Sequence, residues 1–540
     1  MAWINRTGIQ LTTILLVFFG VIAAGLIGVS TRWGPSAYGD STGYIEVAHN
    51  LMVGNGPVQI KGSGKIMLLT TRPPFYSMAL ALFSLPGEPL IDAARILDVV
   101  LFALFVAGVG LAIYGMLHRP LVSLAASMFL LTSPTMVSVF SGAMSEPLFY
   151  VLGFSGLFLL IFYLQTGRRS FWWASAVLTG LSSVTRFTGA TMIATGCLIL
   201  LLFSSRSFIK RVKESLGYLG VSLLPFLAWA IYLRWMGTYP GQYSLPAAEA
   251  LVTMLRSSAR AFIEIFFNWL PWGAAYAAHH PNHHGLMIAI LALFALIGLV
   301  ACFYYAGRKG LVRSAHRVDF QMGVTFGALI LIYVVFLLIT YIVVLNPKPR
   351  LDERMLSPLL IAFLLSGIGF LIFALDSIKS RRIPASAPAG ILLVFIIANS
   401  IPTVTYVKAM YAEGDGYTSR AWHQSAVISA LKTLPPNVHI ISDDIEAVMF
   451  FTFRPATRIP ELESHTREPI GQAFGDDPND SVQRMFRDHQ AVLVLFNTAY
   501  WQFYDLYGSA DTMKRLNAFT RGLYPYFKGS DGAIYYYSAP

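Results

Sequence analysis

Long runs of apolar residues constrain this chain more than any other feature of its sequence. Several runs reach the roughly 17–25 residues that a helix needs to cross a bilayer. A single soluble core could not bury so many of them. The composition agrees, because 55% of the residues are hydrophobic and only 12% are charged, whereas soluble domains carry about 25% charged residues. The sequence therefore predicts a polytopic α-helical membrane protein.

About eleven membrane spans are predicted from these runs. The segment 171–204 holds Arg186 in its middle and is expected to form a tight hairpin of two spans, of which the first is short. The start of the chain lacks a short apolar region with a small-residue cleavage site, so the first span is expected to be an uncleaved anchor. The predicted spans are 8–30, 91–117, 121–140, 147–166, 171–186, 188–204, 215–236, 286–306, 321–345, 355–375 and 386–404.

The basic residues between the spans predict the orientation of the chain. With the N-terminus inside, all five basic clusters fall on one face, and Lys and Arg mark the cytoplasmic face of a membrane. The net charge of +11 is then a topology signal with affinity for anionic lipid, and no nucleic-acid partner is expected. The predicted location is the plasma (inner) membrane. The clusters are His118-Arg119, Arg168-Arg169, Arg206 to Lys213, Arg308 to Arg317, and Lys379 to Arg382.

The opposite, extracytoplasmic face receives the segments with the most polar chemistry. These are the first loop 31–90, the short connection 141–147, the large loop 237–285 and the C-terminal region 405–540. The two loops hold amphipathic stretches and aromatic residues, which are typical of interfacial helices.

The C-terminal region changes character, because strand and helix patterns alternate there. A small extracytoplasmic α/β domain is predicted over 405–540, after a transmembrane catalytic domain over 1–404. The expected strands are 438–441, 491–496 and 533–537, and the expected helix is 443–451.

Asp40 is the first candidate for chemistry, because it follows the first span directly. Apolar residues after it form one helical stripe, made by Tyr44, Ile45, Ala48, Leu51 and Met52. Asp40 would then lie at or just before the start of that helix. Two roles stay open for its carboxylate, a helix N-cap and a general base.

Arg72 precedes Pro73 and Pro74, and a proline pair makes a stiff, extended entry to a helix. The stiffness fixes where the arginine points. A guanidinium beside an interfacial helix can grip a phosphate with a planar fork of donors. The alternative is an interfacial arginine that reaches toward lipid headgroups.

Three further charges lie at the ends of apolar segments. Glu146 precedes Pro147, where it either complements a helix dipole or takes part in a site. Arg186 and Arg354 lie at the extracytoplasmic ends of their segments, and charge near membrane depth is usually paired or functional. Arg354 follows an Asp-Glu pair, so local pairing is an alternative for it.

Metal-binding chemistry has one candidate segment. His279, His280, His283 and His284 lie within six residues of each other, and histidine-rich loops either bind divalent ions or are incidental. The two cysteines, Cys197 and Cys302, both fall inside predicted spans, so neither a disulfide framework nor a cysteine metal site is expected.

Taken together, these motifs resemble the GT-C superfamily of membrane glycosyltransferases, and within it the protein O-mannosyltransferases and the lipid A aminoarabinose transferases. That family carries Asp-x-x-x-Tyr-x-x-x-Ala in its first extracytoplasmic loop, matched by Asp40, Tyr44 and Ala48. A downstream Lys/Arg-Pro-Pro is matched by Arg72 with its two prolines. The likeness covers most of residues 1–405.

Later motifs continue the resemblance in the same order. An acid-Pro-Leu-Phe matches Glu146 to Phe149, a basic residue in the middle hairpin is similar to Arg186, and a Glu-Arg-x-x-x-Pro matches Glu353 to Pro358. Two positions depart from the pattern. Many relatives have Asp-Glu where this chain has Asp40-Ser41, and the aminoarabinose enzymes have a Glu, associated with a metal site, at the position of Thr71.

The resemblance implies inverting transfer of a sugar from a polyprenyl-phosphate donor to an acceptor glycan, lipid or protein. It implies Asp40 as general base, Glu146 as a second catalytic acid, and Tyr44 and Glu353 as substrate-positioning residues. Arg72, Arg186 and Arg354 would bind the donor phosphate. No cofactor is required, and a divalent metal at the four histidines is an open possibility. The chain has no glycine-rich phosphate loop, as expected for a donor that is not a nucleotide.

Two other functions share parts of this pattern. A transporter or flippase of lipid-linked sugars would also be a polytopic membrane protein, but it would place its binding groups near the bilayer midplane and show a repeat in two halves. A GT-C-like ligase or polymerase of lipid-linked oligosaccharides is the other alternative.

Overall fold

The structure is a computed structural model of the whole chain. The residues it describes are 2–61, 65–70, 72–85, 87–236, 248–273, 316–343, 351–378, 386–459, 481–508, 512–514, 516–517 and 520–538.

Internal contacts divide the chain into two compact units. The helical unit comprises Met1–Thr31, Thr70–Tyr76 and Arg95–Tyr411, and the second unit comprises Arg32–Leu69, Ser77–Ala94 and Ala412–Pro540. Most of the predicted first loop thus groups with the C-terminal region. The predicted domain boundary at 404/405 falls inside a helix that continues to Glu413.

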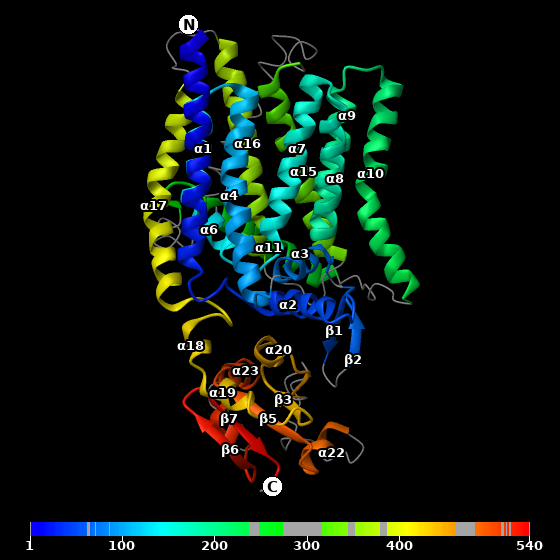
Figure 1. The fold of residues 1–540 in the computed structure, drawn as a ribbon, viewed down its shortest axis with the longest axis vertical. Helices are drawn as coiled ribbons and strands as arrows, with labels where there is room; N and C mark the ends of the chain where they lie inside the picture. Colours follow the sequence, from blue (N-terminus) through cyan, green and yellow to red (C-terminus); the bar gives the residue numbers. More distant parts are fainter. Residues whose placement is uncertain are drawn as a thin grey trace. The chain divides into compact units, whose positions relative to one another are not determined.

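Long helices make up the first unit and run side by side in Figure 1. Three of its helices, α3, α4 and α17, cross from one unit to the other. The helices are α1 (Ala2–Ser30), α3 (Phe75–Ser84), α4 (Leu90–Leu117), α5 (Pro120–Thr132), α6 (Pro134–Phe140), α7 (Glu146–Thr166), α8 (Arg169–Thr185), the 3-10 helix η2 (Phe187–Gly189), α9 (Ala190–Phe203), α10 (Phe208–Trp235), α11 (Ala248–Asn268), α15 (Val318–Val343), α16 (Glu353–Ile378) and α17 (Ala387–Glu413).

Among the described residues, seven helices are long and apolar enough to cross a membrane. An eighth crossing results if α5 and α6, which meet at 63°, count as one bent span. The bend lies at Ser133 and Pro134, because Ser133 accepts a hydrogen bond from Met136 N while the proline has no N–H to continue the helix.

Three of the eleven predicted spans are not among these crossings, for two different reasons. The segments 171–186 and 188–204 are helices α8 and η2–α9, which are too short to qualify as spans by length. The predicted span 286–306 lies outside the described residues.

Small residues let α8 approach its neighbours α7 and α10 closely. A Cβ on Gly156 of α7 would lie 2.7 Å from Thr179 Cγ2 of α8, and one on Gly180 would lie 2.6 Å from the Ser222 carbonyl oxygen of α10. Such close packing is typical of membrane helix bundles. In lipid, helices associate through close van der Waals packing at small residues, because the hydrophobic effect does not drive them together.

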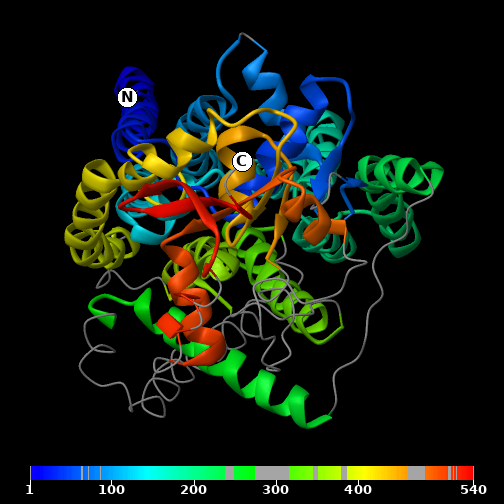
Figure 2. The same ribbon diagram turned by 90° about the horizontal axis from the view of Figure 1, so that it is seen from below.

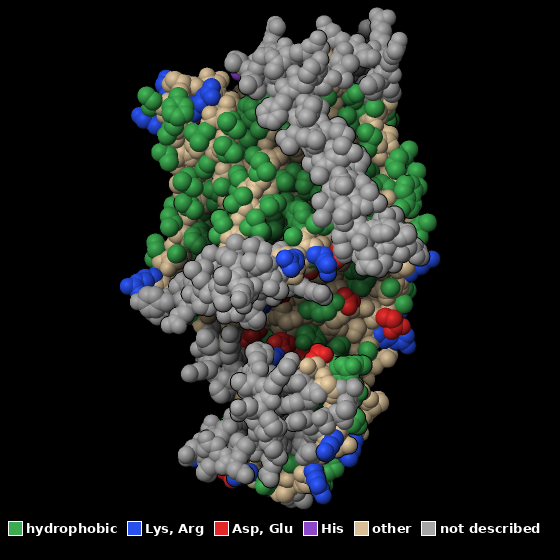
Figure 3. Space-filling model, turned by 180° about the vertical axis from the view of Figure 1, so that it is seen from behind, with side chains coloured by type: hydrophobic (Ala, Val, Ile, Leu, Met, Phe, Trp, Pro, Cys, Tyr) green, Lys and Arg blue, Asp and Glu red, His purple; other side chains and the backbone are tan. Residues whose placement is uncertain are grey.

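The lateral surface of the helical unit is apolar. Hydrophobic side chains largely cover its described part in Figure 3, and Ile14, Ile231, Leu331 and Ile401 are exposed members of this surface. A soluble monomer rarely exposes so large a patch. The outward-facing residues therefore fit a lipid environment.

Helix α11 is oriented differently from the long helices. In Figure 2 the long helices are seen end-on, whereas α11 lies across the view. It belongs to the loop 237–285, for which the sequence predicts interfacial helices.

The second unit holds a five-stranded sheet with the order β4-β3-β5-β7-β6. Strands β4, β3 and β5 are parallel to one another, and β7 is antiparallel to both β5 and β6. The strands are β3 (His439–Ser442), β4 (Ala456–Arg458), β5 (Ala491–Phe496), β6 (Tyr524–Gly529) and β7 (Gly532–Tyr536), and the helices are α18 (Arg420–His423), α19 (Ala426–Leu431), α20 (Ile445–Thr452), α22 (Ser481–Arg487) and α23 (Thr498–Tyr507).

Alternate residues of the buried strand β5 pack into two cores. Val492 and Val494 pack against α19 and α20 on one face, and Leu493 and Leu495 pack with Phe486 and Phe503 on the other. A strand buried on both faces needs a continuous apolar run, which Ala491–Phe496 supplies.

The rest of the second unit comes from the first loop. It contains α2 (Gly39–Met52) and a hairpin of β1 (Val58–Lys61) and β2 (Lys65–Leu68). The residues before α2 pair with the segment after α17, because Tyr417 N donates to the Ala37 carbonyl at 2.9 Å and Thr418 Oγ1 donates to the Pro35 carbonyl at 2.8 Å. Gly416 permits this contact, since it has φ of +61° and a Cβ there would lie 2.1 Å from Ala37 O.

Asp443 is a buried carboxylic acid at the end of β3. It accepts hydrogen bonds from Phe496 N and Thr498 Oγ1, each at 2.9 Å. Burial nevertheless raises the pKa of Asp443 to about 7, and the nearby Asp444 charge adds to the rise.

This raised pKa predicts a pH dependence of stability. An unfolded Asp443 ionises above about pH 3.8 while the folded residue stays protonated, so stability is highest below that pH, falls as pH rises to about 7, and then levels off. The loss amounts to at most about 4 kcal/mol. Asp443→Asn keeps the carbonyl acceptor without the charge, so it removes this dependence.

Hydrogen exchange measures the effect. The exchange of the β3 and β5 amides is compared between the full-length wild-type protein and full-length Asp443→Asn at each pH from 4 to 8. A difference between the proteins that stays constant across this range contradicts the assignment.

Candidate functional site

Asp40 is the second residue of α2, in its first turn. The N-cap is Tyr38, whose backbone N–H donates to Ser41 Oγ at 3.2 Å. The predicted cap role of Asp40 is therefore wrong, because the helix begins one residue before it. An acid in the first turn still complements the helix dipole. Ser41, which departs from the family pattern, supplies the side-chain bond at this helix start.

The predicted apolar stripe of α2 is correct only in part. Tyr44, Ile45 and Ala48 are buried, but Met52 is exposed and the polar Glu46 and Asn50 are buried as well. Burial on several sides follows from the packing of α2 between other elements, among them α20 and β1. Tyr44 lies one turn after Asp40, so the two side chains share a helix face.

Glu146 lies at the centre of an ion-pair cluster in the helical unit. Its side chain is only 2% exposed; Arg186 Nη1 is 2.7 Å from its Oε2, and Arg354 Nε is 3.3 Å from its Oε1. The two guanidiniums are 22% and 28% exposed. Two cations on one carboxylate leave positive charge in excess within this group of three. We call Glu146, Arg186 and Arg354 the arginine cluster.

Local structure explains how the three charges meet. Glu146 is the first residue of α7, before Pro147. Arg186 has extended backbone at the end of α8, where the hairpin turns, and its Nη1 also donates to Ser145 Oγ at 3.0 Å. Arg354 is in the first turn of α16. All three thus lie at helix ends.

Glu353 faces other partners than the arginine cluster. It accepts hydrogen bonds from Thr135 Oγ1 and, at 3.1 Å, from Trp269 Nε1. The local pairing considered for Arg354 is present with Asp352, at 3.7 Å.

Arg72 is half-buried in the helical unit, followed by the buried Pro73 and Pro74 that lead into α3. Its predicted phosphate-binding role stays a proposal.

Sequence reasoning missed several polar residues of this unit. Asp98 of α4 is fully buried, and neither carboxyl oxygen has a hydrogen-bond partner in the described part of the chain. Glu146 is among the charges that act on it. Tyr150, also buried, shares a hydrogen bond with Ser357, and Tyr333 donates to the Met355 carbonyl at 2.8 Å. A carboxylate inside an apolar segment is a signal that could have identified Asp98.

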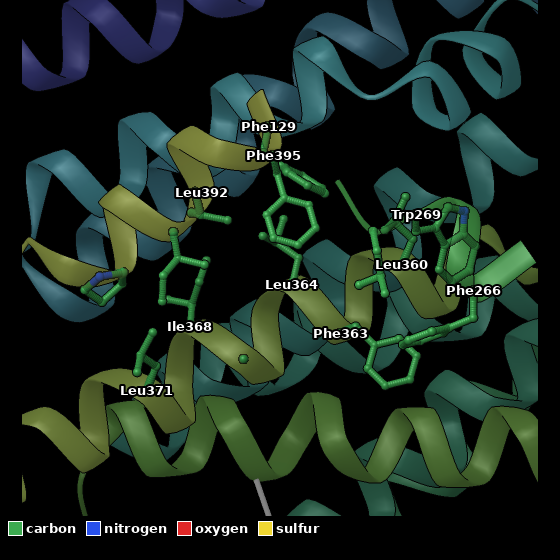
Figure 4. Close-up of a pocket in the computed structure, with 14 residues that line it drawn as sticks. Phe129, Phe266, Trp269, Leu360, Phe363, Leu364, Ile368, Leu371, Leu392 and Phe395 are labelled. Carbon is green, nitrogen blue, oxygen red and sulfur yellow. The ribbon is translucent and has the colours of Figure 1, made fainter. Parts of the chain in front are cut away.

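An apolar hollow of about 260 Å³ lies in the helical unit. The labelled side chains of α5, α11, α16 and α17 surround it in Figure 4. Trp269, which donates to Glu353, is part of its wall. The lining is Phe129, Phe266, Trp269, Leu270, Leu360, Phe363, Leu364, Gly367, Ile368, Leu371, Pro388, Ile391, Leu392 and Phe395.

The predicted histidine metal site, residues 279–284, lies outside the described residues. Among the residues with described positions, no group of three or more His, Cys, Asp or Glu side chains is arranged to hold a metal.

No family model matches the sequence, and no curated protein matches it. Solved structures do match. ArnT from Cupriavidus metallidurans bound to undecaprenyl phosphate is 10% identical with a TM-score of 0.55, over 97% of this chain and 99% of that chain.

Two structures of the Archaeoglobus fulgidus oligosaccharyltransferase also match. The form tethered with an acceptor peptide is 12% identical with a TM-score of 0.51, and AglB in complex with an inhibitory peptide and a dolichol-phosphate is 11% identical with a TM-score of 0.50. Each match covers 97% of this chain and 74% of that chain. These proteins are GT-C superfamily glycosyltransferases, and the chain has their fold. The predicted resemblance is confirmed at the level of the fold.

The arginine cluster predicts a stability effect. Glu146→Gln removes the only negative charge of the cluster and leaves two partly buried guanidiniums without it. This should destabilise the protein by about 1–3 kcal/mol, less than the loss of a fully buried ion pair because solvent partly screens the two guanidiniums. Thermal unfolding of the detergent-solubilised protein checks this, with a drop in midpoint expected.

Glu413→Gln is the matched control. It removes an exposed pair with Arg420 at 3.8 Å, in which the side chains are 70% and 48% exposed, and should change stability by no more than about 0.5 kcal/mol. Equal midpoints for the two variants would show that Glu146 does not anchor the arginines.

Proposed function

We propose that this protein is a membrane glycosyltransferase that moves a sugar from a polyprenyl-phosphate donor to an acceptor hydroxyl. The observation that carries the proposal is the arginine cluster, in which two guanidiniums are held together at helix ends in a chain with a GT-C fold. Such a group can stabilise the phosphate that leaves during transfer, because negative charge grows on that phosphate in the transition state.

The donor side has two supports. Proteins of the same fold have been solved with undecaprenyl phosphate and with a dolichol-phosphate. The apolar hollow offers this chain a place for part of an isoprenoid tail, and Trp269 joins its wall to Glu353, the neighbour of Arg354. Arg72 is the third proposed phosphate ligand.

The proposed reaction inverts the anomeric centre. The acceptor oxygen attacks the anomeric carbon, the bond from that carbon to the phosphate oxygen breaks, and polyprenyl phosphate leaves. Asp40 takes the hydroxyl proton as general base, with Tyr44 and Glu353 positioning the substrates. Glu146 holds the phosphate-binding arginines in place.

Further parts of the proposal concern topology and acceptor. The sugar is a hexose or a pentose, and the acceptor is a glycan, a lipid or a protein. The active site faces the extracytoplasmic side of the plasma membrane, in a chain of about eleven spans with its α/β domain on that side. A divalent ion at His279, His280, His283 and His284 is an addition that the proposed reaction does not require.

A transporter of lipid-linked sugars is less favoured. The charges of the arginine cluster lie at the first or last turn of their helices, whereas transporters bind substrate at broken helices near the midplane. A ligase or polymerase acting on lipid-linked oligosaccharides uses similar donor chemistry. Its substrates distinguish it from the proposed enzyme, because its donor carries an oligosaccharide and not a single sugar.

A reconstituted assay tests the function. The full chain in liposomes is given a panel of synthetic polyprenyl-phosphate hexoses and pentoses, with and without EDTA, and release of polyprenyl phosphate is measured. We expect release from at least one donor, also in the presence of EDTA, and a loss of about 10²–10⁴-fold in rate with Asp40→Asn, which removes the base.

Asp92→Asn is the matched control, because Asp92 is an acid in the first turn of α4 with no proposed part in the reaction. It should keep the wild-type rate. Full activity of Asp40→Asn would disprove the base assignment, and flipping of donors without bond cleavage would favour the transporter.

A further inference from the structure

The second unit presents the carboxyl ends of three parallel strands, β4, β3 and β5, along one edge of its sheet. In open α/β sheets, ligands bind at this edge. Arg458 is the last residue of β4, and Glu446 is the second residue of α20, which follows β3. Both side chains therefore belong to the edge at which a ligand site is expected.

The same edge lies against the start of α2. A Cβ built on Gly39 would be 4.0 Å from Glu446 Cγ, so Glu446 lies close to the residue directly before Asp40. The other end of α2 is held as well, because His49 stacks on Phe453 at a ring distance of 4.2 Å. These contacts all fall within one unit of the chain.

Glu446 and Arg458 form an ion pair, with Arg458 Nη2 at 3.2 and 3.4 Å from the two Glu446 oxygens. Each side chain is 35% exposed, so a ligand can reach both. Arg458 Nε is buried and has no hydrogen-bond partner among the described residues, which leaves a donor that the folded chain does not satisfy.

The neighbouring acids have structural roles. Asp444 caps α20 by accepting from Ala447 N at 2.9 Å and also accepts from Tyr417 at 2.9 Å. Asp443 is bound to Phe496 and Thr498. Among the described residues of this edge, Glu446 and Arg458 form a charged pair that neither caps a helix nor fills the core.

We propose that Glu446 and Arg458 position the acceptor beside Asp40 and that the acceptor they select is a glycan. The inference rests on the proposed glycosyltransferase function. When the two groups are held side by side, the carboxylate accepts a hydrogen bond from one hydroxyl and the guanidinium donates one to the next hydroxyl. This arrangement matches the adjacent hydroxyls of a sugar ring. An anionic acceptor would be attracted by Arg458 and repelled by Glu446.

The test uses the full chain in liposomes with a donor that the wild-type enzyme cleaves. Octyl glycosides of common hexoses and pentoses serve as acceptor probes, and release of the sugar to water in their absence measures donor chemistry alone. We expect Glu446→Gln and Arg458→Met each to raise the KM for the glycoside about tenfold with little change in kcat, and to leave hydrolysis unchanged. Arg487→Met, an exposed change on α22, should leave both reactions unchanged.

The outcomes separate this inference from the function on which it rests. Cleavage of no donor by the wild-type protein overturns both. If Asp40→Asn is inactive but both pair variants keep the wild-type KM, only the acceptor role is wrong. A lower KM for Glu446→Gln together with a higher KM for Arg458→Met indicates an anionic acceptor and overturns the glycan assignment. The assignment is also overturned if the wild-type enzyme transfers the sugar to water but to no glycoside. Unchanged hydrolysis shows that the variants are folded.

Discussion

A single buried carboxylate organises the charged part of the helical unit. Glu146 has almost no contact with solvent, and an ion at such a position costs several kcal/mol unless it is paired. Its partners come from the end of α8 and the start of α16, so the ion pairs tie three helix ends together. The arginines in turn depend on Glu146 for their position. Two guanidiniums are thereby held side by side at helix ends, and Asp352, which is 49% exposed, is a second partner of Arg354.

The sequence indicated the members of this cluster, although not their pairing, for a physical reason. Charges at the ends of apolar segments must find partners or serve a function, so Glu146, Arg186 and Arg354 stand out without knowledge of the fold. Asp98 was missed because a single acid barely changes the hydropathy of a 27-residue run such as 91–117, by which the span was identified. The cap role of Asp40 failed because helix ends are set by local hydrogen bonds, here those of Tyr38 and Ser41, that pattern alone does not locate.

Elements formed by distant contacts were predicted less well than local ones. The buried strands β3 and β5 have strong apolar runs and lie where the sequence indicated them. The three-residue β4 and the exposed β6 have no such pattern and exist through their neighbours in the sheet. The grouping of the first loop with the C-terminal region had no local signal either, because it depends on the pairing of Ala37 with Gly416.

Because of that pairing, the residues proposed to select the acceptor can vary separately from those proposed to bind the donor. The proposed base Asp40 and the pair of Glu446 and Arg458 belong to one unit, whereas the arginine cluster belongs to the other. Changes in the segments after β3 and β4 can alter which hydroxyl is presented to the base without altering the residues proposed to hold the donor phosphate. Function in a common fold changes through such local sites. The two sites proposed for donor and acceptor can therefore change independently of each other, because they lie in different units of the chain.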